Sequence, residues 1–88
     1  MSNSDRATLG ALALDLKRVA LGYYKGSYKT AEIFLNEAIK RKNELNKKNL
    51  KPHLIKFLSR IEDLKNRKER SADDALMYST IFQNASQV

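Results

Sequence analysis

The sequence predicts an all-α protein, a compact four-helix bundle in a single domain covering residues 1–88. Apolar residues recur three and four positions apart along most of the chain, which is the period of an amphipathic helix. The chain has one proline and few β-branched residues, so little in it opposes helix formation. Its 88 residues suit one domain. We expect a three-helix antiparallel core to which a fourth, C-terminal helix is added.

The first expected helix runs from Ser4, a favourable N-cap, to about Lys25. Its apolar residues form two stripes. The main stripe, which should face the core, comprises Leu9, Leu12, Ala13, Leu16, Val19, Ala20, Tyr23 and Tyr24. The second stripe lies about 120° away around the same helix and comprises Ala7, Leu14 and Leu21. A helix with two apolar sides is expected to lie between two layers of protein.

Gly26-Ser27 ends the first helix, and a second helix is expected from about Tyr28 to Asn46. Ile33 lies on the outer side of this helix. Its buried face comprises Ala31, Phe34, Leu35, Ala38 and Leu45. The linker over residues 46–49 is polar and short, so the next helix should pack antiparallel to the second.

Pro52 suits the first turn of a third helix, because the N–H that proline lacks has no partner there. The core positions of this helix are Leu54, Phe57, Leu58, Ile61 and Leu64. A fourth helix is expected after Ser71-Ala72-Asp73-Asp74, which resembles a capping box, and should end near Ala85. Its inward residues are expected to be Ala72, Ala75, Leu76, Ser79 and Phe82. The other apolar residues, which should lie on its other side, are Met77, Tyr78, Ile81 and Ala85. This surface either covers the second stripe of the first helix or meets another protein.

The net charge of +7 is concentrated in one segment. Residues 40–70 contain twelve basic and four acidic side chains, whereas residues 1–39 carry +1 and residues 71–88 carry −2. Such a cluster is typical of contact with nucleic acid or an acidic protein surface, and a solvated face is the alternative interpretation. The residues expected to contact a phosphate backbone are Lys40, Arg41, Lys47, Lys48, Lys51, Lys56, Arg60 and Arg67.

Three tyrosines, Tyr23, Tyr24 and Tyr28, flank the first turn beside Lys25 and Lys29. Aromatic rings placed between lysines can stack on bases while the cations hold phosphates. The alternative is that these rings close one end of a small core.

Catalysis is not expected from these residues. The chain has no cysteine, which excludes disulfides, thiolate metal sites and a cysteine nucleophile. His53 is a lone histidine, and none of the three glycines belongs to a phosphate-binding loop. We therefore expect no metal and no cofactor. The N-terminus shows no signal peptide and no apolar run reaches the about 20 residues of a membrane span, so we expect a cytoplasmic protein without a membrane partner.

Two segments carry a resemblance to known helical families, GSYKTAEIFLNEAI at residues 26–39 and FLSRIEDLK at residues 57–65. The first resembles the turn and second helix of a tetratricopeptide-type hairpin, and the second is similar to the third helix of the MIT domain. Together they cover about residues 9–68. The spacing before Gly26 departs from the tetratricopeptide pattern, only one repeat is present, and MIT domains lack a fourth helix. The resemblance implies a groove that binds a partner's helical tail at exposed positions such as Ile33, Lys40, Lys56 and Arg60.

Size, charge and surplus apolar surface together predict a non-catalytic accessory or adaptor protein. It would dock on a larger protein and contact a phosphate backbone without sequence preference, as small accessory subunits of replication and other nucleic-acid machines do. An MIT-like peptide-binding bundle is the alternative. The residues expected to contact a protein partner are Leu14, Leu21, Ile33, Tyr78 and Ile81. A homodimer through the first and fourth helices is the alternative to a different partner chain.

Overall fold

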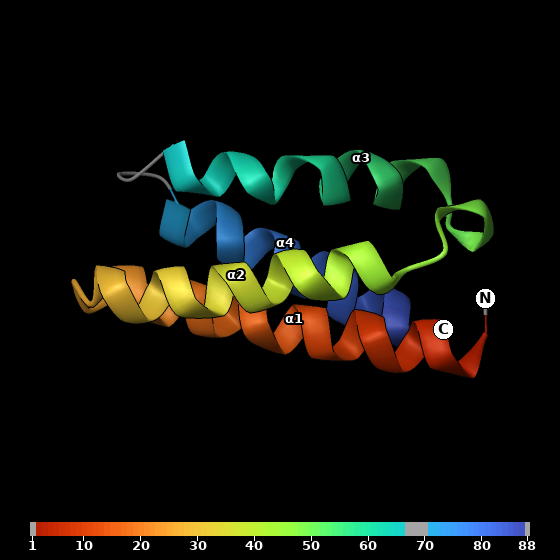
Figure 1. The fold of residues 1–88 in the computed structure, drawn as a ribbon, viewed down its shortest axis with the longest axis horizontal. Helices are drawn as coiled ribbons and strands as arrows, with labels where there is room; N and C mark the ends of the chain where they lie inside the picture. The colour runs from red at the N-terminus through yellow and green to blue at the C-terminus, as the bar shows by residue number, and fades with distance from the viewer. Residues whose placement is uncertain (1, 67–70, 88) are drawn as a thin grey trace.

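The computed structural model describes residues 2–66 and 71–87 of the chain. Its elements, in order, are α1 (Asn3–Tyr24), α2 (Tyr28–Glu44), the 3₁₀ turn η1 (Lys47–Asn49), α3 (Pro52–Arg60), the 3₁₀ turn η2 (Glu62–Asn66) and α4 (Ser71–Ser86). Each α-helix runs antiparallel to the one before it, and η1 lies at the same end of the bundle as both chain termini (Figure 1). The prediction of an all-α four-helix bundle is confirmed.

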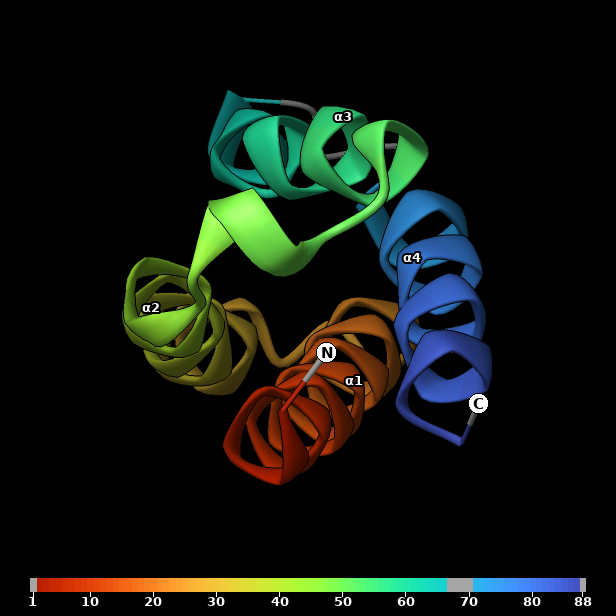
Figure 2. The same cartoon turned by 90° about the vertical axis from the view of Figure 1, so that its right-hand side faces the viewer.

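The four helices occupy the corners of a square when the bundle is viewed along its long axis (Figure 2). α1 and α3 lie at opposite corners, and α2 and α4 occupy the other two. The backbone of α1 approaches those of α2 and α4 closely along their lengths, whereas α3 comes near the backbone of α4 at only a few positions. The bundle therefore has a tight part, built around α1, and a more widely spaced part under α3.

Small side chains allow the close approach to α1. A Cβ atom added to Gly22 of α1 would lie 2.9 Å from the Cβ of Ala31 in α2. Against α4, the buried Ser79 hydroxyl donates a hydrogen bond of 2.8 Å to the carbonyl oxygen of Ala13 in α1. We call Ala13, Gly22, Ala31 and Ser79 the small-residue seam. Because these side chains are short, the seam fixes how near the helices lie.

The turn between α1 and α2 depends on Gly26, whose φ of 72° lies in the left-handed region that favours glycine. The N–H of Gly26 donates to the carbonyl oxygen of Tyr23 at 3.1 Å, and the N–H of Ser27 donates to that of Gly22 at 2.8 Å. This pair of bonds is the Schellman motif, which satisfies carbonyl groups left free at a helix end. The turn directs α2 back along α1 and places Ala31 over Gly22.

Large apolar side chains fill the wider space under α3. We call this set the α3 layer; it consists of Leu54, Leu58, Ile61 and Leu64, all of which are buried. Opposite it, the ring of Tyr78 in α4 packs against that of Phe57 in α3, with centroids 5.7 Å apart. The hydroxyl of Ser71 also donates to the carbonyl oxygen of Leu64 at 2.8 Å, which joins the start of α4 to η2.

Two predictions for α4 are wrong. Tyr78, expected on the outer side, is only 3% exposed, while Leu76, expected to face inward, is 42% exposed. The reason is that α4 is covered on two flanks, by α1 and by α3, so its buried side is wider and turned further toward α3 than one helix partner would require.

The expectations for α1 also need correction. The helix is capped by Ser2, not Ser4, because the Ser2 hydroxyl accepts the N–H of Asp5 at 3.0 Å. Tyr24 was expected in the core, but it is exposed and its hydroxyl donates to Asp73 Oδ1 at 2.6 Å. α1 does lie between two layers, α2 and α4. Neither of them covers the second stripe, since Leu14 and Leu21 are each 47% exposed.

Candidate functional site

The basic residues of the middle segment are spread over three elements. Lys47, Lys48 and Lys51 come together on η1 and just after it, and all three side chains are exposed. Lys56 is exposed on α3. These four lysines have no ion-pair partner within residues 2–66 and 71–87. They are therefore among the cations of this segment that are available to an anion, and we call Lys47, Lys48 and Lys51 the η1 lysines.

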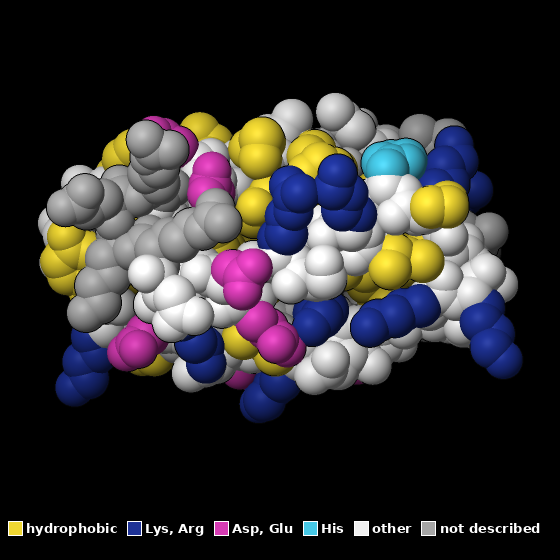
Figure 3. Space-filling view, turned by 90° about the horizontal axis from the view of Figure 1, so that it is seen from above, with side chains coloured by type: hydrophobic (Ala, Val, Ile, Leu, Met, Phe, Trp, Pro, Cys, Tyr) yellow, Lys and Arg dark blue, Asp and Glu magenta, His cyan; other side chains and the backbone are white. Residues whose placement is uncertain are grey.

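Charged side chains are unevenly distributed along the surface over α3. Seen from that side, lysine and arginine side chains and the single histidine gather over the half that contains η1 and the start of α3 (Figure 3). Most of the aspartate and glutamate side chains visible on this face lie in the other half (Figure 3). On this face the positive side chains are thus displaced toward one end of the molecule.

The other predicted phosphate contacts are placed differently. Lys40 pairs with Glu37 at 3.5 Å on the surface of α2. Arg41 is half-buried against α1, where its Nε lies 3.6 Å from Asp15 Oδ2. The guanidinium of Arg60 lies over the ring of Phe57, 5.7 Å from its centroid. Arg67 lies outside the described residues. The structure therefore brings together the η1 lysines, but not the whole predicted set.

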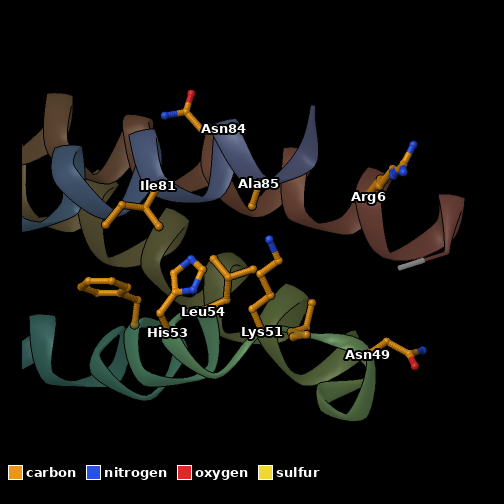
Figure 4. Close-up of a pocket in the computed structure, with 10 residues that line it drawn as sticks. Arg6, Asn49, Lys51, His53, Leu54, Ile81, Asn84 and Ala85 are labelled. Atoms are coloured by element: carbon orange, nitrogen blue, oxygen red, sulfur yellow. The ribbon is translucent and has the colours of Figure 1, made fainter. Parts of the chain in front are cut away.

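An apolar groove lies beside the η1 lysines, between the start of α3 and the end of α4, with the first turns of α1 at its mouth (Figure 4). We call it the α3–α4 groove; its volume is about 560 Å³. Its apolar lining consists of Leu50, Leu54, Phe57, Ile81 and Ala85. Its polar lining consists of Arg6, Asn49, Lys51, His53 and Asn84. The lining includes cations but no carboxylate.

The groove follows from a change in side-chain size along α4. Tyr78 is large enough to reach Phe57 across the space under α3. One turn later Ile81 is smaller, and one turn beyond that Ala85 is smaller again, and both line the groove. Because the backbones of α3 and α4 come near each other at only a few positions, the shorter side chains leave the space unfilled. A chemically apolar hollow open to water is typical of a binding site.

The predicted partner contacts have mixed outcomes. Leu14, Leu21 and Ile33 are exposed, and Ile33 is 56% accessible. Ile81 is half-buried and forms part of the α3–α4 groove. Tyr78 is almost fully buried, and its ring packs on that of Phe57. A groove of the kind that the MIT resemblance implies would run along α2 and α3, whereas the apolar groove runs between α3 and α4.

The tyrosines of the first turn lie at the end of the bundle opposite η1 (Figure 1). Tyr23 is half-buried, and its ring packs on that of Tyr28 with centroids 5.8 Å apart. Tyr24 is held by its hydrogen bond to Asp73. These contacts tie α1 to α2 and to α4. The rings are far from the η1 lysines, so the two features do not form one surface.

Three charged residues in the described part of the chain, Asp5, Asp15 and Lys42, are buried, which was not anticipated from the sequence. Lys42 is buried, and its Nζ donates to Glu62 Oε1 at 2.8 Å, which joins α2 to η2. This hydrogen bond and the charge of Lys42 hold the pKa of Glu62 below its usual value. Asp15 is buried between Arg18 and Arg41; burial raises its pKa, although both arginines oppose the rise. Helical spacing could have located Lys42, since it continues the series Leu35 and Ala38 on the buried face of α2.

Within the described residues, no group of three or more His, Cys, Asp or Glu side chains is placed to hold a metal ion. In the same part of the chain, no helix combines the length and apolar character needed to cross a bilayer. Fold and site together define a small helical bundle with an apolar groove and an adjacent cluster of lysines. No protein-family model, curated protein or solved structure matches this chain.

Proposed function

We propose that this protein is a non-catalytic accessory subunit that docks on a larger protein and contacts the phosphate backbone of nucleic acid through its η1 lysines. The observation that carries the proposal is the gathering of Lys47, Lys48 and Lys51 on and just after η1, where all three side chains are exposed and form no ion pair within residues 2–66 and 71–87. Lys56 extends this cluster along α3. Lys47 contributes to lowering the pKa of Glu62, but none of the three lysines is within ion-pair distance of a carboxylate among the described residues, so their charge is available to a polyanion.

Lysine ammonium groups suit phosphate oxygens and carry little base information. An ammonium is a compact point charge on a flexible stem, so it follows a phosphate backbone without requiring a fixed geometry. Phosphate contacts position a protein on nucleic acid but do not read its sequence. We therefore expect binding that depends strongly on salt and little on base sequence.

The test is binding of fluorescein-labelled oligonucleotides of mixed sequence, as single strands and duplexes, measured by anisotropy at several salt concentrations. The variant carries Lys47→Ala, Lys48→Ala and Lys51→Ala together. Each phosphate contact contributes about 0.7–0.9 to the slope of log affinity against log salt, so the slope should fall by about 2–3. Affinity should fall by a similar factor for every sequence tested.

A matched control carries Lys17→Ala, Lys25→Ala and Lys29→Ala, which removes the same charge from exposed positions on α1 and α2 and in the turn between them. It should retain most of the affinity and slope. Equal losses in the two triple variants would mean that only net charge matters, and absence of binding by the unsubstituted protein at low salt would refute the phosphate contact.

A further inference from the structure

We propose that the α3–α4 groove binds an acidic amphipathic helix of the partner protein, whose apolar side chains enter the groove and whose carboxylates meet Arg6 and Lys51. This inference deepens the proposed function, because it names the surface by which the larger protein is held. It goes beyond the sequence-based partner residues, of which only Ile81 lines the groove.

The shape of the groove favours a helix as occupant. Its walls come from two antiparallel helices, α3 and α4, so it is a furrow that runs with them (Figure 4). Helical peptides commonly bind such furrows by inserting apolar side chains spaced three, four and seven residues apart. The volume of about 560 Å³ is within the usual range for ligand sites. Leu50, Leu54 and Phe57 on one wall face Ile81 and Ala85 on the other.

The charge around the groove favours an acidic occupant. Arg6 and Lys51 are exposed at its mouth, and neither has an ion-pair partner among the described residues. Asn49, His53 and Asn84 complete the polar lining, which contains no aspartate or glutamate. Electrostatic complementarity of this kind selects partners and speeds their association. A basic helix would bring like charges together and would be rejected.

A second copy of this chain fits the groove poorly. Each copy carries a net charge of +7, so two copies repel each other. The groove also lies at the end of the molecule where lysine and arginine gather (Figure 3). Nucleic acid would find cations at this mouth but offers no aliphatic side chain to fill an apolar floor. The observations therefore favour a protein segment in the groove and phosphate on the η1 lysines beside it.

The first experiment selects ligands from a displayed library of helical peptides, using the full chain freed of nucleic acid by nuclease and a high-salt wash. We expect enrichment of apolar residues at helical spacing together with aspartate and glutamate, and depletion of lysine and arginine. Enrichment of basic peptides, or no enrichment, would overturn the proposal. Saturable binding of laurate in the groove without peptide enrichment would reassign the site to a small anionic amphiphile.

The second experiment measures the affinity of the best enriched peptide for two variants of α4. Ala85→Glu puts a carboxylate on the groove wall, whereas Gln83→Glu adds the same charge at an exposed position of the same helix outside the groove lining. Loss of a central contact in an interface costs about tenfold or more in affinity, and we expect this loss for Ala85→Glu only. Equal affinities of the two variants would refute the groove as the site.

A third variant, Arg6→Glu, keeps the proposal testable if Ala85→Glu fails to fold. Arg6 is exposed in the first turns of α1, so the fold should tolerate the change, which circular dichroism would verify. We expect affinity for the acidic peptide to fall and its salt dependence to weaken. Peptide binding without oligonucleotide binding would leave the groove in place and refute the phosphate contact, and the reverse result would refute the groove alone.

Discussion

The contacts of α1 and the contacts of α3 achieve burial by opposite means. Along α1, the small-residue seam brings backbones together until a glycine hydrogen faces an alanine methyl, with no space for another carbon. Under α3, the backbones stay further apart and leucine, isoleucine and aromatic side chains fill the distance. In the first region small side chains allow the short distance between backbones, and in the second region large side chains keep the backbones apart.

This difference explains where the groove forms. A seam of small residues has no unfilled space to offer, because the backbones themselves close it. The space between α3 and α4 is filled only where the side chains are large, and Ala85, which lines the groove, is small. The α3–α4 groove is therefore a consequence of packing α3 through large side chains, because the space stays open where α4 carries a small one.

The largest expected effect comes from removing one side chain of the α3 layer. Leu58→Ala should destabilise the fold by about 2–5 kcal/mol, because Leu58 is fully buried and the widely spaced helices cannot easily collapse onto the space it leaves. Urea unfolding followed by circular dichroism would measure this loss. Ile33→Ala is the control: its side chain is exposed, so the change should lie within about 0.5 kcal/mol. Similar losses in both variants would contradict the packing described for α3.

A smaller destabilisation is expected at the small-residue seam, where the cause is overpacking and not a cavity. Gly22→Ala adds a methyl group that would lie 2.9 Å from Ala31 Cβ, with Ala31 backbone atoms at 3.1 Å. Overpacking costs about 1–3 kcal/mol, and the higher helix propensity of alanine offsets about 1 kcal/mol of it. We therefore expect a net loss of about 1 kcal/mol in urea unfolding.

Gly10→Ala, in the same helix, provides the matched control for Gly22→Ala. Its new methyl group would meet only side-chain atoms of Ser86, the nearest at 3.9 Å, which is an ordinary contact. This variant should gain up to about 1 kcal/mol from helix propensity. The seam would be refuted as a fixed spacing if both alanines stabilised the protein equally.

The smallest expected effect concerns Lys42–Glu62, the ion pair that joins α2 to η2. Because the folded-state pKa of Glu62 is lowered, its ionised form stabilises the fold above its unfolded-state pKa, and this stabilisation is lost as the pH falls through the folded-state value. Glu62→Gln should lower the melting temperature at neutral pH and have no effect in acid. Glu37→Gln, whose partner Lys40 is exposed and 3.5 Å away, should change it less at any pH. A deficit of Glu62→Gln that persisted in strong acid would assign it to packing.

The sequence predicted the helices well because each helix is encoded locally. Helical spacing located all four, and the residues of the main stripe from Leu9 to Ala20 are buried as expected. Gly26 marked the turn for a physical reason that the structure confirms, its left-handed φ. The helical pattern also placed Ile33 at the surface, where its side chain is 56% exposed.

The site was less predictable because it is made by pairs of helices. Leu54 and Ile81 each look like ordinary apolar helix positions, and their approach depends on the antiparallel register of α3 and α4. The two flanks of α4 explain why Tyr78 and Leu76 were assigned to the wrong sides. Charge counting indicated the η1 lysines, but it could not show that Arg41 turns to Asp15 or that Lys42 is buried against Glu62.

The small-residue seam has a consequence for how this protein can diverge. A glycine against an alanine accepts almost no other pair, so substitutions along α1 are constrained by the fold itself. Large apolar side chains can replace one another at modest cost if volume is kept, so the walls contributed by α3 and the end of α4 can change while the frame stays intact. The residues that determine which partner binds can therefore change independently of the fold. Related chains could exchange partners without acquiring a new fold.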